Sequence, residues 1–144
     1  MRSAAPIDDD HRVSWDILIQ DLPGDVASIV EIPDGFRPQP LGDRRELITK
    51  IMEVAPTADF SDPAWGQLET PDFVIEFNMG GEAITDAIML HIRGGDPAAE
   101  FVGSLLHHLG RRAVDSSAGE FFDDAAAAES FARWQAYRDK VIER

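Results

Sequence analysis

The chain of 144 residues has no cysteine, one tyrosine, and 13 lysine and arginine residues against 27 aspartate and glutamate. The absence of cysteine excludes disulfide bonds, thiolate metal sites and a cysteine nucleophile. No stretch approaches the roughly 20 consecutive apolar residues that a membrane-spanning helix requires. The first residues also lack the apolar segment of a secretory signal peptide. We therefore expect a cytoplasmic protein without a membrane segment.

The scarcity of basic residues gives the chain a formal net charge of −14. A field of that sign repels nucleic acids and anionic lipids, and it attracts basic partners. Aromatic residues, 8% of the chain, do not alternate with basic ones as they do on RNA-binding sheets. Two interpretations of the charge remain open: it maintains solubility, or it steers a basic protein partner into a complex. We expect neither nucleic acid nor membrane as a partner.

Length and periodicity predict a disordered arm followed by one domain. Residues 1–12 are polar, acidic and without periodicity, which is typical of a disordered arm. Residues 13–144 suit a single α+β domain, because a chain of this length supports one hydrophobic core. Within it, residues 13–20 alternate apolar and polar side chains, which predicts a half-buried strand.

A long loop and a helix are expected next. Residues 21–42 contain four prolines and three glycines, so they cannot form regular structure for long. Asp43 and Glu46 have the spacing of a capping box, and Pro56 ends the helix that they begin. Apolar residues of the loop are expected to hold it on the body of the protein: Ile29, Val30, Ile32 and Phe36. The helix is expected to bury one apolar face, formed by Leu47, Ile48, Ile51 and Met52.

Three strands form the predicted meander between the first two helices. The short strand WGQLE and the alternating strand FVIEFNM are separated by the turn residues Thr70–Pro71–Asp72. Gly80–Gly81 predicts a tight hairpin into residues 83–93. On this returning strand Ile84, Ile88, Leu90 and Ile92 are expected on the apolar face, where Asp86 is a misfit that a bulge or an edge location would explain.

The last elements complete the fold class. A helix over residues 97–109 ends at Gly110, which has the place of a C-terminal capping glycine. Residues 111–122 predict a weaker strand with an irregularity at Gly119, and residues 125–142 predict a C-terminal helix. Without the short WGQLE strand the order is βαββαβ, the split βαβ or ferredoxin-like pattern. We therefore expect a two-layer α+β fold, with helices on one face of an antiparallel sheet, plus the terminal helix.

The predicted core brings these elements together. Apolar positions of the strands and helices should form one contiguous cluster. Its expected members are Ile17, Ile19, Leu47, Ile51, Phe77, Ile88, Leu90, Phe101, Leu105 and Leu109.

The junction LHIRGGDP resembles a phosphate-binding turn, since a strand and two glycines precede a helix N-terminus. It lacks the later glycine of GxGxxG and the Lys-Ser/Thr of a P-loop. Asp96 is better placed as an N-cap whose carboxylate occupies the same donors, and Pro97 is favoured at the first helical position. The interpretation is a structural turn.

The histidines at the end of the second helix do not indicate a metal site, and the arginines that follow the helix have a structural explanation. Adjacent His107 and His108 diverge by about 100° around a helix, so they cannot both chelate one ion. The pair Arg111–Arg112 is explained by its favourable interaction with the helix C-terminus. We expect no metal, no cofactor and no catalytic serine motif.

The candidate binding site is the polar face of the sheet. Strand alternation places polar side chains from three strands on the face opposite the core, and a carboxylate beside an imidazole can support acid–base chemistry. This face is expected to contain Asp16, Gln20, Glu76, Asn78, His91 and Arg93.

Two hypotheses for function follow. The first is a small acidic binding protein, such as an immunity-type or regulatory inhibitor of a basic protein, because such inhibitors need a complementary surface and no catalytic signature. The second is a small-molecule-binding domain or enzyme that uses Glu76, His91 and Arg93. We favour the first, assign no catalytic residue, and expect a monomer or a homodimer.

Overall fold

The computed structural model describes residues 15–94, 97–116 and 118–122. Within these ranges the chain forms one large antiparallel sheet, a small two-stranded sheet and two α-helices. The elements are β1 (Trp15–Gln20), the 3-10 turn η1 (Ile29–Glu31), β2 (Gly42–Asp43), α2 (Arg44–Val54), β3 (Trp65–Glu69), β4 (Phe73–Asn78), β5 (Ile84–Thr85), β6 (Ala87–Gly94), α3 (Pro97–Leu109), β7 (Arg112–Asp115) and β8 (Glu120–Phe121).

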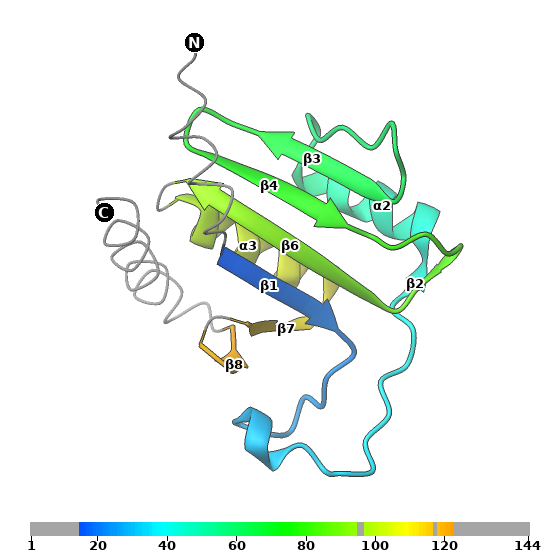
Figure 1. The fold of residues 1–144 in the computed structure, drawn as a ribbon, viewed down its shortest axis with the longest axis vertical. Helices are drawn as coiled ribbons and strands as arrows, with labels where there is room; N and C mark the ends of the chain where they lie inside the picture. The colour runs from blue at the N-terminus through cyan, green and yellow to red at the C-terminus, as the bar shows by residue number, and fades with distance from the viewer. Residues whose placement is uncertain (1–14, 95–96, 117, 123–144) are drawn as a thin grey trace, which may run out of the picture.

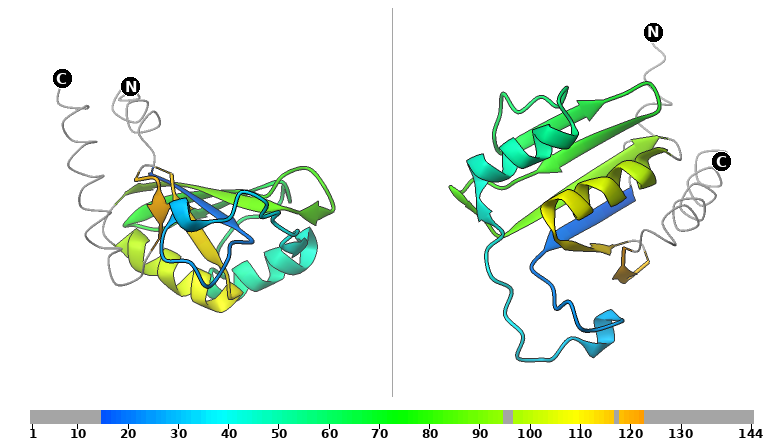
Figure 2. Two further views of the ribbon diagram at one scale, coloured as in Figure 1. Left: turned by 90° about the horizontal axis from the view of Figure 1, so that it is seen from below. Right: turned by 180° about the vertical axis from the view of Figure 1, so that it is seen from behind.

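The large sheet has the strand order β3-β4-β6-β1-β7-β8 (Figure 1). Each strand is antiparallel to its neighbours, with β6 and β1 at the centre. The α+β class and the antiparallel sheet are therefore confirmed. Both α-helices of the described chain lie on the same face of this sheet (Figure 2). We call the opposite face the outer face.

The central strands bury alternate residues, as their sequences predict. In β1 the side chains of Trp15, Ile17 and Ile19 are fully buried, and the residues between them are half-buried. The same alternation runs along β4 and β6. Because side chains alternate between the two faces of a strand, one set faces the helices and the other forms the outer face.

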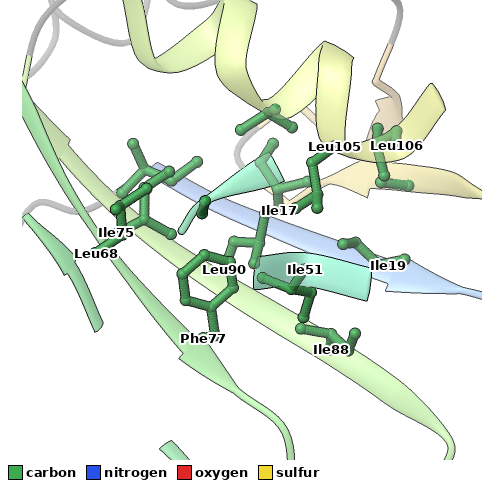
Figure 3. Packing of buried hydrophobic residues seen from close by; sticks show 14 of the residues in the cluster. Ile17, Ile19, Ile51, Leu68, Ile75, Phe77, Ile88, Leu90, Leu105 and Leu106 are labelled. Carbon is green, nitrogen blue, oxygen red and sulfur yellow. The ribbon is translucent and has the colours of Figure 1, made fainter. Parts of the chain in front are cut away.

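The core lies between the sheet and the two helices. Ile17, Phe77 and Leu90 come from three adjacent strands and lie near Ile51 of α2 (Figure 3). The predicted cluster is one contiguous core, with a correction at two positions: Phe101 and Leu109 are partly buried and pack against it. Both belong to α3 and lie at the margins of its apolar stripe, where side chains are partly exposed to solvent.

Helix termini follow the predicted capping chemistry. Asp43 is the N-cap of α2, and its carboxylate accepts a hydrogen bond of 3.1 Å from the backbone N–H of Glu46. The helix ends at Val54, two residues before Pro56. At the end of α3, Gly110 has a φ of 66°, and the N–H of Arg111 bonds to the carbonyl of Leu106, as in a Schellman motif.

The predicted tight hairpin at Gly80–Gly81 is wrong. Residues 79–86 instead form a longer connection in which β5 pairs with β2, outside the large sheet. The strand is interrupted at Asp86, which is exposed, and this break removes the constraint that placed Ile84 on the apolar face. Ile84 is 49% exposed, whereas Thr85 is buried.

Two further expectations need correction. Residues 112–121 form a hairpin of β7 and β8 rather than one strand, and Gly119, with a φ of 68°, lies in its turn. Val30 is 91% exposed, so it does not hold the loop to the body, whereas Ile29, Ile32 and Phe36 are half-buried. The reason is geometric: consecutive residues of η1 point in different directions, and only one side of this turn meets the protein.

Some predictions lie outside the described residues. These are the arm at residues 1–12, the helix at residues 125–142, and the proposed N-cap Asp96 with the preceding Gly95.

Candidate functional site

The outer face brings four of the six predicted polar residues into two adjacent contacts. Strand register places His91 of β6 between Asp16 of β1 and Glu76 of β4. Arg93 lies two residues after His91 on β6, where it is opposite Val74 of β4 and diagonal to Glu76. All four lie on the outer face because their neighbours in each strand point into the core.

The first contact joins the imidazole of His91 to a carboxylate. Nδ1 of His91 is 2.9 Å from Oδ1 of Asp16, within hydrogen-bond distance. The side chains are 27% and 35% exposed, so the pair is partly shielded from water. A carboxylate at Nδ1 holds the ring in one orientation and leaves Nε2 as its second functional atom.

The second contact is an ion pair with an amide beside it. Nη1 of Arg93 is 3.6 Å from Oε1 of Glu76, and both side chains are mostly buried. The other carboxylate oxygen of Glu76 is 3.5 Å from the side-chain nitrogen of Gln67 on β3. The carboxylate of Glu76 therefore links β3 to β6 across the outer face.

The remaining two predicted residues do not join this group. The side-chain carbonyl of Asn78 accepts a hydrogen bond of 3.2 Å from the backbone N–H of Gly80, which is a turn-forming role. Gln20 lies at the end of β1, opposite Ala87 and Arg112. The polar face therefore divides into two adjacent contacting pairs and two peripheral residues.

A fifth outer-face residue was missed by the sequence analysis. Trp65 of β3 stacks on His91, with ring centroids 5.7 Å apart and an interplanar angle of 21°. Its side chain is 37% exposed, which is unusual for tryptophan. Alternation in WGQLE places Trp65, Gln67 and Glu69 on one face and could have indicated it, but only the register with β4 and β6 brings it to His91.

Asp115 of β7 is a buried carboxylate that the sequence analysis also missed. Only 3% of the residue is exposed, and Oδ2 accepts a 3.0 Å hydrogen bond from the indole N–H of Trp15. Its other carboxylate oxygen accepts a bond from the backbone N–H of Ala118 in the turn before β8. Asp115 thus stabilises the β7–β8 turn against β1.

The two arginines after α3 hold the long loop. Arg112 donates hydrogen bonds of 2.6 and 2.9 Å to the carbonyls of Pro23 and Val26. Arg111 donates to the carbonyl of Leu41 and is 3.4 Å from the carboxylate of Asp21. The predicted explanation, an interaction with the helix terminus alone, is therefore incomplete, since these side chains hold both ends of the loop at residues 21–41.

Charge is distributed unevenly along the chain. Residues 51–90 contain eight carboxylates and no lysine, arginine or histidine. All but Glu76 are exposed, and five of them lie on β3, on β4 or in the segments adjoining β3. We call this group of five the acidic edge; it consists of Asp59, Asp62, Glu69, Asp72 and Glu76.

Asp59 is tied to the edge strand by its backbone and to Ser61 by its side chain. Its backbone N–H and carbonyl pair with those of Gln67, at the otherwise open edge of β3. The hydroxyl and the backbone N–H of Ser61 both donate to its carboxylate, and these bonds hold the pKa of Asp59 below its ordinary value. Hydrogen bonds to the charged form have this effect, so Asp59 stays ionised at neutral pH.

The described ranges were the basis for two further findings, on metal ligands and on membrane-spanning helices. No group of three or more histidine, aspartate or glutamate side chains there is arranged to hold a metal ion. Nε2 of His108 is 2.8 Å from the carboxylate of Glu53, so this contact links α3 to α2. In the same ranges no helix combines the length and apolar character needed to cross a membrane.

Comparisons of the chain with protein-family models, with curated proteins and with solved structures gave no match.

Proposed function

We propose that this protein is a small acidic binding protein, such as an immunity-type or regulatory inhibitor, which engages a basic protein partner through the outer face of its sheet. The observation that carries the proposal is the charge distribution. The net charge is −14, and the β3–β4 side of the sheet lies in a stretch of forty residues without a basic side chain. Complementary potentials accelerate encounter and select partners of opposite sign.

The outer face is suited to contact rather than to a deep site. It combines half-buried polar groups with an exposed tryptophan, and tryptophan is enriched at protein interfaces. The polar groups already contact one another, so a partner would meet an ordered surface and lose little entropy in binding it.

The proposal is tested by identifying a partner and measuring its salt dependence. The immobilised protein is used to capture partners at 25 mM salt, and each captured protein is purified and titrated by calorimetry between about 50 and 400 mM salt. We expect a partner with a basic surface whose affinity falls at least about tenfold over that range, because screening weakens long-range charge attraction. Capture alone decides nothing. An affinity independent of salt, or no partner at low salt, would contradict the proposal.

One observation favours the second candidate, an acid–base or small-molecule site. The Asp16–His91 pair has the arrangement of a general base and the carboxylate that orients it. Acylation of histidines by diethyl pyrocarbonate, mapped by mass spectrometry, separates the two functions. A catalytic imidazole should react faster than the exposed His107, whereas a structural one, being mostly covered, should react more slowly.

We also propose that the fold follows the ferredoxin-like split βαβ pattern. The order β4-β6-β1-β7, with α2 between β1 and β4 in the chain and α3 between β6 and β7, supports this assignment. Strands β3 and β8 then extend the sheet at its two edges. A cytoplasmic location and a monomeric or homodimeric state remain expectations from the sequence.

A further inference from the structure

Trp65 is the feature of the outer face that the charge argument does not explain. Of the three large apolar side chains that the described residues expose, it alone lies in the large sheet. Val30 is in the loop turn η1, and Ile84 is in the small sheet. A tryptophan with more than a third of its surface in water costs solubility unless a partner covers it, and tryptophan is enriched among the residues that dominate binding energy.

The position of the Trp65 ring is fixed before any partner arrives. It stacks on His91 with ring centroids 5.7 Å apart, and His91 is in turn held by Asp16. Trp65 remains 37% exposed despite this contact, so part of the indole is open to a ligand. A side chain that is already ordered loses little conformational entropy when a ligand group stacks on it.

Acidic residues lie before Trp65 in the chain and beside Gln67, its neighbour on the same face of β3. Asp62 belongs to the turn that leads into β3, where its carbonyl accepts a bond from the N–H of Trp65. Asp59 pairs with Gln67, two residues further along the strand, and Glu76 contacts the Gln67 side chain. No basic residue occurs in the chain between Lys50 and His91, and Arg93 pairs with Glu76. The other four carboxylates of the acidic edge are exposed, so a basic partner can reach them.

We propose that Trp65 and the acidic edge form the docking surface for an arginine side chain of the basic partner, with its guanidinium stacked on the exposed part of the indole. We call this arginine site at Trp65 the anchor. Arginine fits this surface better than lysine. Its planar group stacks on aromatic rings and pairs with carboxylates, and tryptophan is the best aromatic acceptor of a cation. The proposal rests on the proposed function, because it assigns the centre of the same interface.

Three peptides of one length test this proposal. In each, glycine alternates with arginine, lysine or citrulline, which retains the planar group of arginine without its charge. Binding to the full chain, isotopically labelled in its backbone and tryptophan side chains, is followed by NMR at low salt. The indole N–H signal of Trp65 is assigned by its loss in the variants Trp65→Ala and Trp65→Met, and Val30→Ala is the matched control for an exposed apolar residue.

We expect the arginine peptide to shift the Trp65 indole signal and to bind about threefold or more tightly than the lysine peptide, with citrulline weakest. Trp65→Ala and Trp65→Met should each weaken arginine binding about five- to tenfold, and Val30→Ala should leave it unchanged. Trp65→Met keeps an apolar side chain, so it guards against a simple loss of folding in the alanine variant.

Two different failures are distinguishable. If the basic peptides shift the backbone signals of β4 and β6 while both Trp65 variants bind as tightly as wild type, the arginine site at Trp65 is wrong. The acidic outer face would still be supported as the binding surface. Equal binding of the arginine and citrulline peptides would also overturn the anchor, because no cation would then be recognised. If no basic peptide shifts any outer-face signal, the anchor and the proposed function both fail.

Discussion

Replacing Leu90 by alanine tests the assignment of the two sheet faces. Leu90 is fully buried and lies in register with Ile17 on one side and Phe77 on the other. The change removes three carbon groups, which at about 0.8 kcal/mol each gives about 2.4 kcal/mol of lost transfer free energy. Neighbours held by strand pairing cannot collapse into the space, so a cavity term raises the expected loss to about 3–4 kcal/mol.

The loss is measured by urea unfolding followed by circular dichroism. With a slope of about 2 kcal/mol per molar urea, the midpoint should fall by about 1.5–2 M. Val30→Ala is the control, because its side chain is 91% exposed and its truncation should change the free energy of unfolding by less than about 0.5 kcal/mol. A change of that small size for Leu90→Ala would refute the assignment of faces.

Five further substitutions, at four positions, test two glycines, the helix cap and the ionisation of Asp59. Gly94→Ala should cost more than about 3 kcal/mol in the same urea assay, since its φ is 129° and a Cβ would meet backbone atoms at 2.4 and 2.6 Å. Gly110→Ala, with open space at its Cβ, should cost only about 1–2 kcal/mol; equal costs would contradict this reasoning. Asp43→Ala should cost about 0.5–2 kcal/mol and Asp43→Ser much less, because serine keeps the acceptor; equal losses would exclude the cap. An NMR titration should place the pKa of Asp59 below its ordinary value, and Ser61→Ala, which removes the hydroxyl but keeps the backbone N–H, should raise it. The stabilisation is therefore present at neutral pH and is lost as pH falls below about 4. An unchanged pKa in the variant would show that the hydroxyl bond does not lower the pKa.

Local patterns predicted most of the elements correctly because their causes are local. The alternation of β1 and β4 is a property of consecutive residues, and so is the cap at Asp43. The helix predicted over residues 97–109 has those bounds in the structure. Its end is fixed by Gly110, whose positive φ is available to glycine at little cost.

The errors occurred where distant segments decide the structure. Gly80–Gly81 has the sequence of a tight turn, but β2 and β5 pair across about forty residues, and no local pattern encodes that pairing. The same applies to the candidate site. The polar character of β1 and β6 was readable, whereas the stacking of Trp65 on His91 requires the register of three strands.

The central claim is that carboxylates of the outer face and the acidic edge bind a basic partner. It is tested most directly by the affinity of the captured and purified partner for variants that each remove one negative charge, Glu76→Gln at the face and Asp34→Asn in the exposed loop. We expect the affinity to fall about three- to tenfold for Glu76→Gln and less than about twofold for Asp34→Asn at 100 mM salt. The reason is that the loop carboxylate contributes only long-range attraction. Equal losses for the two variants would show that net charge alone governs binding and would contradict the assignment of the interface.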